Sequence, residues 1–529
     1  MNAAAAAPQN FVTFGAIGLL PGAGFGLEGP APAAEAPVAG LAVDSREVKP
    51  GFVFFAIPGT QLDGAEFIQF ALRMDAAAIV ATPEGAARMV PEGGWPVPVL
   101  TTETPRRALA LAAAAFYGAQ PATMAAVTGT NGKTSTAHFL RQIWCATGLP
   151  AASLGTTGIE GGTSAVPDAF DGPLGHTTPE PITLHRALAQ LSAAGCSHAV
   201  MEASSHGLAQ HRVDGVRLTA AALTHITRDH LDYHADHEAY VAAKLRLFDA
   251  VLPEQGTAVI NLDDPVGGRA MALAAARRQQ TITTGRDARA DLRLVAQHFR
   301  TGGQDLVIAH EGREHAVALG LVGTYQAENV LTAAALALGT GLSAEAVFAA
   351  LPRLRTVRGR MELAGHRANG AAVYVDYAHT PGALASALAS LRPHATGNLV
   401  CAFGAGGDRD RGKRPMMGEA VALGADMGIV TDDNPRSEDP AFIRAAVFDG
   451  ARAALGDRPQ RLQNIGGRAE AILAGVDALE GPGDVLLIAG KGHEQGQEVG
   501  GQMLPFDDVA QARAAIAVLD GEDLGELGS

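Results

Sequence analysis

Apolar runs of strand length alternate with longer segments of helical spacing along most of the chain. From Met124 onward, runs such as MAAVTG, SHAVMEAS and GTAVINLDD alternate with segments such as KTSTAHFLRQIWCATG and DHEAYVAAKLRLFDAVL. Strands that alternate with helices in this way predict βαβ units and a mostly parallel, doubly wound sheet. We therefore expect an α/β fold.

The same alternation, with its interruptions, predicts three domains. Residues 41–59 predict short strands with a Pro-Gly turn, and residues 1–120 as a whole are expected to form a small N-terminal α/β domain. Residues 121–354 hold the series described above and end in helical stretches such as AENVLTAAALALGTG. A second series, with AAVYVDYA, NLVCAFGA and DVLLIAGKG, predicts a Rossmann-like C-terminal domain over residues 355–529. Residues 23–40, rich in Ala, Pro and Gly, are expected to be loop.

Composition narrows the class of protein. A chain of 529 residues exceeds what one core usually serves, and 47% hydrophobic residues with 18% charged ones is ordinary for a folded protein. The net charge of −15 argues against a nucleic-acid-binding surface. The three cysteines, Cys145, Cys196 and Cys401, form no CxxC pair, and no apolar run reaches the length of a membrane span. We expect a cytoplasmic protein without membrane insertion.

The segment VTGTNGKTS, residues 127–135, lies between a predicted strand and a predicted helix. Glycines in such a turn let backbone N–H groups face a phosphate, a lysine reaches its outer oxygens, and the next Thr binds Mg²⁺. Val127 stands where the usual P-loop has a glycine, and a purely structural turn is the alternative. The pattern predicts a nucleotide site made of Gly129, Thr130, Asn131, Gly132, Lys133, Thr134 and Ser135.

Glu202 follows the predicted strand SHAV, at the strand end where doubly wound sheets bind ligands. A carboxylate there suits a hard cation such as Mg²⁺. The alternative is a carboxylate that caps a helix or lies in a loop.

Four histidines, His225, His230, His234 and His237, follow in one segment. His230 and His234 have the i, i+4 spacing of a zinc motif, but position 231 is Leu where an HExxH motif has Glu. Zinc therefore stays an alternative to solvent-facing or second-sphere histidines. Lys244, in the following predicted helix, would on its own be a solvated lysine.

The segment TDDNPRSEDP, residues 431–440, places one arginine among four carboxylates. Pro435 fixes its own φ and restricts Asn434, so Arg436 leaves a stiff backbone in a defined direction. Asp439 and Pro440 look like the N-cap and first residue of a helix. A surface turn and a binding loop both fit this pattern.

Seven ordered segments carry a family resemblance: GTNGKTS, MEASSHGL, TRDHLDYH followed by AAKLRLF, GTYQAENVLTAAA, RGRME, DYAHTP and GGDRDRGKRP. Together they resemble the Mur ligases, ATP-dependent amide ligases that build the peptidoglycan precursor, from about Val43 to about Glu494. The resemblance implies that ATP phosphorylates the D-Glu carboxylate of UDP-MurNAc-L-Ala-D-Glu and that the amine of meso-2,6-diaminopimelate attacks the acyl phosphate. The expected partners are these two substrates, with no nucleic acid, and the expected oligomeric state is a monomer.

The resemblance also implies roles for residues near the nucleotide. Lys133 would hold the phosphates, Thr134 and Glu202 would bind Mg²⁺, and His230 would organise the metal site. Lys244 matches a lysine that the family carbamylates, which converts an ammonium into an N-carboxylate that coordinates Mg²⁺. Asn329 and Arg360 would contact ATP, with Asp376 and His379 lining the cleft between the central and C-terminal domains.

Substrate-binding positions are implied in the same way. The UDP-sugar peptide would contact Val43, Ser45, Thr60, Gln61, Leu62, Thr177, Thr178, Ser204, Gln210 and Arg212. His176 and His225 stand where the family often has Asn. Diaminopimelate would contact Arg409, Asp433, Asn434, Pro435, Arg436, Gly490 and Glu494.

Arg436 is the expected determinant of selectivity. It would pair with the far carboxylate, which lysine lacks, and a buried guanidinium left unpaired would penalise lysine. The alternatives are a lysine-adding ligase, a folylpolyglutamate or cyanophycin synthetase, a P-loop motor or switch ATPase, and a non-catalytic scaffold.

Overall fold

A computed structural model describes residues 12–22, 24–59, 62–161, 174–227, 233–300, 302–456 and 461–521. The chain divides into two compact parts, residues 1–284 with 335–343 and residues 285–334 with 344–529. Parallel strands alternate with helices in both parts, which confirms the predicted α/β class.

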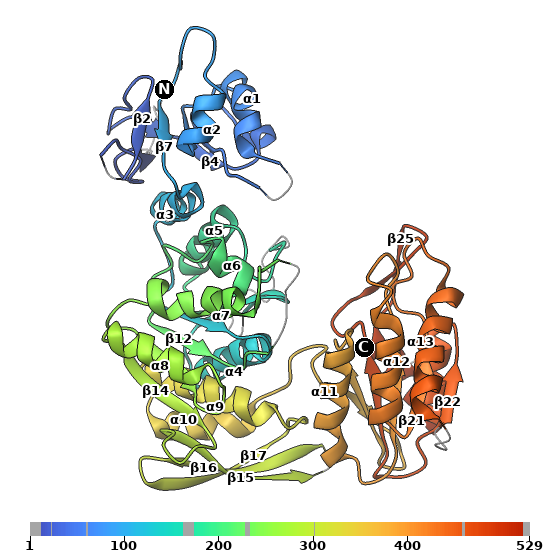
Figure 1. Ribbon diagram of the computed structural model, residues 1–529. Helices are drawn as coiled ribbons and strands as arrows, with labels where there is room; N and C mark the ends of the chain where they lie inside the picture. The colour runs from blue at the N-terminus through green and yellow to red at the C-terminus, as the bar shows by residue number, and fades with distance from the viewer. Residues whose placement is uncertain are drawn as a thin grey trace, which may run out of the picture. The chain divides into compact units, whose positions relative to one another are not determined.

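A small sheet begins the first part and is drawn in blue in Figure 1. Its strand order is β2 (Gly26–Glu28), β7 (Val99–Thr101), β6 (Ala78–Ala81), β5 (Phe52–Phe55) and β4 (Gly40–Ala42). Helices α1 (Ile68–Arg73) and α2 (Pro83–Arg88) accompany it, and a short ladder joins β1 (Val12–Thr13) to β3 (Pro37–Val38). Phe54 and Phe55 enter different core clusters because successive strand residues face opposite sides of the sheet.

The stretch expected to be loop contains strands within its described residues 24–40. β2 pairs antiparallel with β7, with Leu27 opposite Leu100, and so supplies an edge strand to the small sheet. The sequence did not predict this strand because the stretch is rich in Ala, Pro and Gly and has no alternation of apolar and polar residues. A short edge strand is held by backbone hydrogen bonds to its neighbour, which such a pattern does not reveal.

The larger sheet of the first part is parallel apart from its β10 edge, as the strand series predicted. Its order is β10 (Gly158–Gly161), β9 (Ala151–Gly155), β11 (His198–Glu202), β8 (Thr123–Thr128), β12 (Ala220–Leu223), β13 (Thr257–Asn261) and β14 (Gln280–Gly285). Glu202 is in register with Val127, and Leu223 is in register with Thr128. The carboxyl ends of β11, β8 and β12 therefore meet at one sheet edge.

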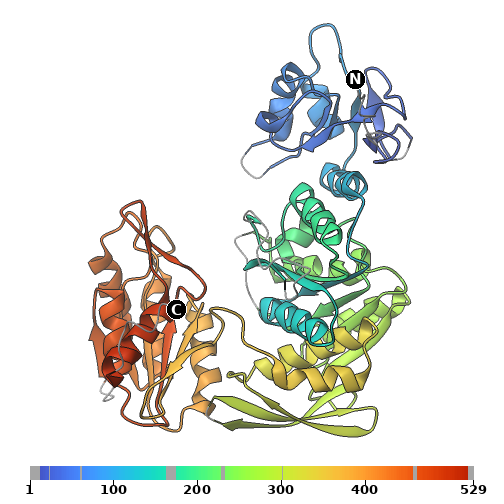
Figure 2. The same cartoon turned by 180° about the vertical axis from the view of Figure 1, so that it is seen from behind.

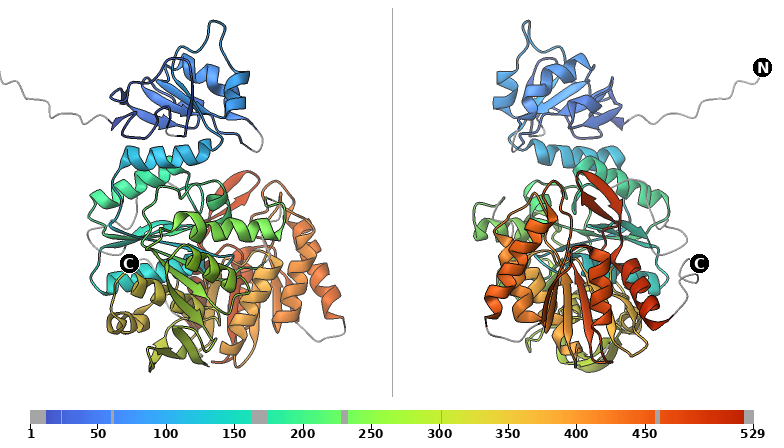
Figure 3. Two further views of the ribbon diagram at one scale, coloured as in Figure 1. Left: turned by 60° about the vertical axis from the view of Figure 1, so that its left-hand side comes forward. Right: turned by 90° about the vertical axis from the view of Figure 1, so that its right-hand side faces the viewer.

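Helices connect these strands. They are α3 (Pro105–Tyr117), α4 (Lys133–Ala146), α5 (Pro181–Ala193), α6 (Ser205–Ala209), α7 (His237–Arg246) and α8 (Gly267–Ala276). α4 packs against β8, β9 and β11, and α3 lies beside α5 (Figure 3). The long runs of Ala and Leu in α3 and α5 supply the apolar faces of this contact.

The second part contains an antiparallel ribbon that the sequence patterns did not predict. β15 (Leu292–Arg300), β16 (Gly303–His310) and β17 (Arg313–Leu319) pair in succession and are drawn in yellow-green in Figure 2. Helices α9 (Gln326–Gly339) and α10 (Ala344–Ala350) follow along the chain, as the helical stretches there indicated.

The C-terminal sheet has the order β18 (Glu362–His366), β19 (Ala372–Asp376), β23 (Val485–Ala489), β20 (Leu399–Phe403), β21 (Met427–Val430) and β22 (Arg461–Asn464). Only the β18–β19 pair in this order is antiparallel. Helices α11 (Pro381–Leu391), α12 (Lys413–Gly424) and α13 (Pro440–Leu455) share one core cluster, whereas α14 (Arg468–Asp477) and α15 (Asp508–Asp520) share the other. Helices therefore cover both faces (Figure 3), and a hairpin, β24 (Gly496–Val499) with β25 (Gln502–Pro505), projects beside the sheet.

The start of α13 is capped as its sequence indicated. The Asp439 side chain accepts a hydrogen bond from Ala441 N, with Pro440 at the first helical position, so the predicted cap is confirmed. Within the part of the chain that the structure describes, no helix combines the length and the apolar character that a membrane span requires.

Candidate active site

The phosphate loop joins the end of β8 to the start of α4. Gly129 and Gly132 have φ values of +151° and +83°, and a Cβ at position 129 would lie 1.9 Å from Thr224 Oγ1. Glycine adopts these positive φ values at the smallest cost, and at position 129 only glycine leaves room for the Thr224 side chain. Lys133 Nζ donates to the carbonyl oxygens of Gly129 and Thr130, at 3.0 and 2.8 Å. The α4 N-terminus and this lysine thus form the arrangement that binds phosphate in P-loops.

Glu202, the last residue of β11, is 2% exposed. Both carboxylate oxygens accept from Thr134 Oγ1 at 3.0 Å, and Oε1 also accepts from Thr156 N at 2.8 Å. A Cβ at Gly155 would lie 2.0 Å from Glu202 Oε1, so the neighbouring strand must carry glycine there. The site therefore places oxygen donors of the type that Mg²⁺ prefers beside the phosphate loop.

Lys244 is not a solvated lysine, because its exposed fraction is 1%. Its Nζ donates to Gly129 O at 2.7 Å and lies 4.6 Å from the ring centroid of Tyr240, one helical turn earlier. The Tyr240 hydroxyl is 2.8 Å from Thr130 Oγ1. Helix α7 thus places two side chains of one face against the phosphate loop.

The histidine segment is only partly described. His230 lies outside the described residues, so the zinc alternative and the metal-organising role of His230 stay predictions. His225 Nδ1 is 2.9 Å from Asp264 Oδ2, and His234 lies among the rings of His206, Tyr233 and Tyr240. Burial opposes ionisation of Asp264, but hydrogen bonds from His225 and two backbone N–H groups hold the pKa of that carboxyl below its usual value.

The positions expected to bind the sugar and peptide form one hydrogen-bonded cluster beside Glu202. Thr178 Oγ1 donates to Glu202 O at 2.8 Å and to Ser204 Oγ at 3.0 Å, and Arg212 Nη1 donates to Thr178 O at 2.8 Å. Gln210 Oε1 accepts from Arg212 Nη2 at 2.7 Å. Thr177 joins through Thr156, with their hydroxyl oxygens 3.1 Å apart.

The cluster is also electrostatically perturbed. Burial, followed by the charge of Arg106, lowers the pKa of Arg212. Burial, followed by the charge of Arg212, lowers the pKa of His176. Arg106 and Arg212 are the cations of this cluster, and two neighbouring guanidinium groups favour an anionic ligand.

The expected uridine-binding positions lie in the small N-terminal sheet region. Ser45 is buried and starts a turn capped by Asp44, whereas Val43 and Leu62 are exposed. Thr60 and Gln61 lie outside the described residues. The structure therefore separates this group in sequence and sheet from the Thr178 cluster.

The remaining nucleotide positions lie in the second part of the chain. Asn329 is buried in α9 and donates to Gln326 Oε1 at 3.1 Å, and the Arg360 guanidinium lies 5.0 Å from the ring centroid of Tyr377. Asp376 ends β19 and accepts from Met361 N and Ala378 N, both at 2.9 Å. Burial, only partly offset by Arg360, raises the pKa of Asp376. His379 is exposed.

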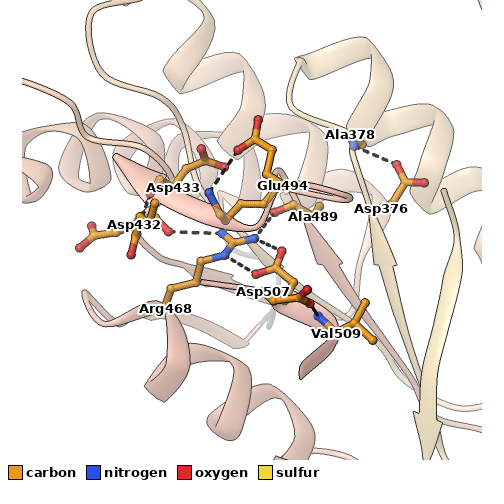
Figure 4. A network of polar contacts seen from close by, with 12 residues as sticks. Asp376, Ala378, Asp432, Asp433, Arg468, Ala489, Glu494, Asp507 and Val509 are labelled. Atoms are coloured by element: carbon orange, nitrogen blue, oxygen red, sulfur yellow. Dashed lines mark hydrogen bonds and ion pairs between the residues drawn. The ribbon is translucent and has the colours of Figure 1, made fainter. Parts of the chain in front are cut away.

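The loop after β21 carries the expected acceptor site (Figure 4). Asp433 is buried; its Oδ1 accepts from Asn434 N at 2.7 Å, while its Oδ2 has no hydrogen-bond partner among the described residues. A Cβ at Gly490 would lie 2.4 Å from that Oδ2. A buried carboxylate oxygen without a donor is costly unless a ligand supplies one.

Asn434 and Glu494 meet at a buried lysine. Asn434 Nδ2 donates to Glu494 Oε2 at 3.0 Å, and Lys491 Nζ donates to Asn434 Oδ1 and Glu494 Oε2 at 3.0 and 3.2 Å. Lys491 is fully buried. These contacts fix the orientation of the Asn434 amide and join the loops that carry Asn434 and Glu494.

Arg436 has a φ of +53°, in the left-handed region. Its Nη1 donates to Gly407 O at 2.8 Å, and its Nε lies 3.1 Å from Glu498 Oε2. The expected penalty from an unpaired guanidinium is therefore wrong, because internal partners serve Arg436 without any ligand. Arg409, on the loop after β20, is exposed.

Several residues of these clusters were not predicted. Thr156 follows β9 at the same sheet edge as Glu202, and Tyr240 precedes Lys244 by four residues. Lys491 lies between Gly490 and Glu494 in AGKGHE. Each could have been found from the sequence: Thr156 from its place after a strand, Tyr240 from its i, i+4 spacing to Lys244, and Lys491 from its motif.

Comparison with known proteins agrees with this arrangement. Residues 37–117 match the family model described as Mur ligase family, catalytic domain, and residues 127–337 match the Mur ligase middle domain. Residues 359–492 match the Mur ligase, glutamate ligase domain. The three matches follow the small sheet, the larger sheet and the C-terminal sheet in order, which is the three-domain architecture of the family.

Two full-length relatives and one solved structure share a name. The UDP-N-acetylmuramoyl-L-alanyl-D-glutamate–2,6-diaminopimelate ligase of Caulobacter vibrioides is 48% identical over 483 residues, which cover 91% of this chain and 96% of the relative. The Rhizobium meliloti protein of that name is 48% identical over 489 residues, or 92% and 96%. A solved structure with that name is 31% identical, covers 96% of this chain and 99% of its own, and superposes with a TM-score of 0.71. The order of the motifs, the three matched domains and the full-length relatives lead to one conclusion: this chain belongs to the Mur ligase family.

Proposed function

We propose that the chain uses ATP to join meso-2,6-diaminopimelate to the D-Glu carboxylate of UDP-MurNAc-L-Ala-D-Glu. The observation that carries the choice of acceptor is the 433–436 loop, where the buried Asp433 Oδ2 lacks a donor among the described residues and Arg436 presents a guanidinium. An amino acid with an amine and a distant carboxylate complements both groups. The names of the full-length relatives support the same substrates.

The phosphate loop is the proposed ATP site. The backbone N–H groups at the start of α4 and the Lys133 ammonium would hold the phosphates. Asn329 and Arg360 are proposed as further nucleotide contacts, and Asp376 and His379 as residues that line the nucleotide cleft. Lys133 Nζ donates to the carbonyl oxygens of Gly129 and Thr130. We expect these hydrogen bonds to be replaced by contacts to phosphate oxygens when ATP binds.

The donor set beside the loop fits Mg²⁺. Thr134 Oγ1 and the Glu202 carboxylate lie in hydrogen-bond contact, and both are hard oxygen donors. A bound Mg²⁺ would neutralise charge on the transferring phosphoryl group. We include His230 among the residues proposed to organise this site.

Lys244 is proposed to act as an N-carboxylate. A buried ammonium beside the loop would oppose a divalent cation, whereas addition of CO₂ to the neutral amine, with loss of one proton, yields a carboxylate. The 2.7 Å contact to Gly129 O places Nζ at the loop that would hold the phosphates. The modified side chain would then add an oxygen donor to Thr134 and Glu202.

The reaction follows from these positions. A D-Glu carboxylate oxygen attacks the γ-phosphorus of ATP, ADP leaves, and the acyl phosphate forms; the acceptor amine then attacks the carbonyl carbon and phosphate leaves. Phosphorylation is needed because a carboxylate is a poor electrophile and lacks a good leaving group. We propose that Thr177, Thr178, Ser204, Gln210 and Arg212 hold the sugar and peptide, and that Val43, Ser45, Thr60, Gln61 and Leu62 hold the uridine end.

At the acceptor, Asp433 and Asn434 would receive an amine and Arg436 the far carboxylate, while Gly490, Glu494 and Arg409 complete the pocket. Since Arg436 already has internal partners, selectivity against lysine would come from a gained charge-assisted pair rather than from an unpaired guanidinium. Glu498 must release Arg436, at least partly, when the far carboxylate binds.

Phosphate release tests the proposal. ATP, Mg²⁺ and UDP-MurNAc-L-Ala-D-Glu are supplied with meso-diaminopimelate, L-lysine or no amino acid. We expect release that depends on diaminopimelate. Equal rates with L-lysine would refute the selectivity, and release without any amino acid or dipeptide would favour a plain ATPase.

Three further properties belong to the proposal. The domain boundaries are placed at residues 120 and 354, the protein acts as a monomer, and it works in the cytoplasm. Size-exclusion chromatography with light scattering tests the second of these, and a mass of two chains would refute it.

A further inference from the structure

A buried ion pair lies beneath the two loops of the acceptor site. Arg468 Nε and Nη2 donate to the two carboxylate oxygens of Asp508 at 2.7 and 2.6 Å, and both side chains are 0% exposed. Such a bidentate pair has fixed geometry. The pair belongs to α14 and α15, which lie on one face of the C-terminal sheet.

The remaining donors of Arg468 reach the backbone of both acceptor loops (Figure 4). Its Nη2 donates to Ala489 O at 3.0 Å, and its Nη1 lies 3.3 Å from Asp432 O. Ala489 directly precedes Gly490, and Asp432 directly precedes Asp433. The Arg468 guanidinium therefore joins the backbone of two loops, one residue before Asp433 and one residue before Gly490, both of which we assign to diaminopimelate.

The two loops approach each other where this connection matters. A Cβ at Gly490 would lie 2.4 Å from Asp433 Oδ2, the oxygen that we assign to the substrate amine. A small change in loop spacing would therefore alter the surroundings of that oxygen.

Helix stability does not explain the position of Arg468. It is the first residue of α14, where the helix dipole disfavours a cation. Burial opposes its charge as well, but Asp508 and the more distant carboxylates Asp433 and Glu494 raise the pKa of Arg468 above its usual value. The arginine therefore remains charged among these carboxylates.

We propose that Arg468, held by Asp508, is a positioning residue that sets the spacing of the Asp433 and Gly490 loops and so the affinity for diaminopimelate. The inference rests on the proposed function of this site. Arg468 uses its donors on Asp508 and on backbone carbonyls, so it acts through the loops and not through contact with the substrate.

Steady-state kinetics test this role through the separate KM of each substrate. In Arg468→Lys, one ammonium replaces the fork, and we expect the KM for diaminopimelate to rise up to about 100-fold, since misplacement by an ångström has effects of that size. The KM values for ATP and UDP-MurNAc-L-Ala-D-Glu should stay within about twofold.

A second variant protects the test against misfolding. Arg468→Met with Asp508→Leu removes both charges together, which leaves no buried charge of this pair without its partner. We expect a folded domain, seen by circular dichroism, with the same selective rise in the diaminopimelate KM.

Arg367 and Asp520 supply a matched control in the same domain. Arg367 Nε donates to Asp520 Oδ1 at 2.8 Å and Nη1 donates to Val476 O at 2.8 Å, away from the acceptor loops. Arg367→Lys should change stability without changing the diaminopimelate KM. An equal KM rise in both variants, or none in Arg468→Lys, would overturn the inference, whereas a wild-type enzyme without diaminopimelate-dependent phosphate release would overturn the proposed function.

Discussion

Lys244 Nζ and Gly129 O lie 2.7 Å apart, although their residues are 115 positions apart in the sequence. We expect Lys244→Ala to lose activity because it removes the proposed N-carboxylate beside the phosphate loop. Short-chain carboxylic acids should restore part of the activity by filling the vacated space. Phosphate release measured over a range of acetate concentration checks this.

Lys244→Arg is the matched control for that rescue. Arginine keeps a positive charge, fills the space and cannot form the carbamate, so it should stay inactive with acetate. Full activity in Lys244→Ala without added acid would contradict the carbamate proposal.

Glu202→Gln should weaken Mg²⁺ binding. The change keeps the shape and an acceptor for Thr134 Oγ1 but removes the negative charge, so the Mg²⁺ concentration for half-maximal activity should rise by about 10- to 100-fold. Magnesium titration of phosphate release measures this. Glu238→Gln alters an exposed carboxylate of the same domain, paired with Arg269, and an equal shift there would exclude a local role for Glu202.

Arg436→Asn should reduce selectivity for diaminopimelate over L-lysine. A charge-assisted hydrogen bond contributes about 1.5–3 kcal/mol, so kcat/KM for diaminopimelate should fall by about 10- to 100-fold while the value for L-lysine changes little. Competition between the two amino acids, followed by mass spectrometry of the product, measures the ratio. A parallel fall for both amino acids would mean that the variant damages the loop instead.

We expect His185 to make the free energy of unfolding depend on pH. It is 1% exposed in α5, and burial lowers its pKa to about 4 from 6.5. Below pH 6.5 His185 binds a proton in the unfolded chain but stays neutral in the native state. The free energy of unfolding should therefore fall between pH 6.5 and 4, by at most about 3 kcal/mol.

Urea unfolding at about pH 7.5 and about pH 5, on either side of the ordinary histidine pKa, measures this difference. His185→Gln keeps a donor for Asp214 O and should flatten the pH dependence, whereas replacement of the exposed His366 by Gln should not. An unchanged slope in His185→Gln would assign the pH dependence to other groups.

The sequence predicted the features that local pattern controls. The strand and helix around Lys133, the strand end at Glu202 and the cap at Asp439 all follow from residues close together in the chain. The β15–β17 ribbon was missed because polar residues occur along strands such as Leu292–Arg300, so no apolar run marks them.

Sequence patterns did not predict contacts between residues that lie far apart in the chain. Arg468 meets Asp508 across 40 residues and meets Asp432 across 36. Asp508 is an ordinary residue for a helix start, and no pattern near Arg468 in the sequence indicates which carboxylate it pairs with. The internal pairing of Arg436 with Glu498 was likewise invisible, and it changed the expected origin of selectivity.

The left-handed backbone at Arg436 limits how this loop can evolve or be redesigned. Asn, Asp and Gly adopt a positive φ at small cost, whereas Val, Ile and Thr are strongly disfavoured there. An acceptor pocket that required a β-branched apolar residue at 436 would therefore need a rebuilt loop, not one substitution. The backbone conformation therefore limits which residue types can replace Arg436, and with them which acceptor side chains the pocket can be redesigned to bind.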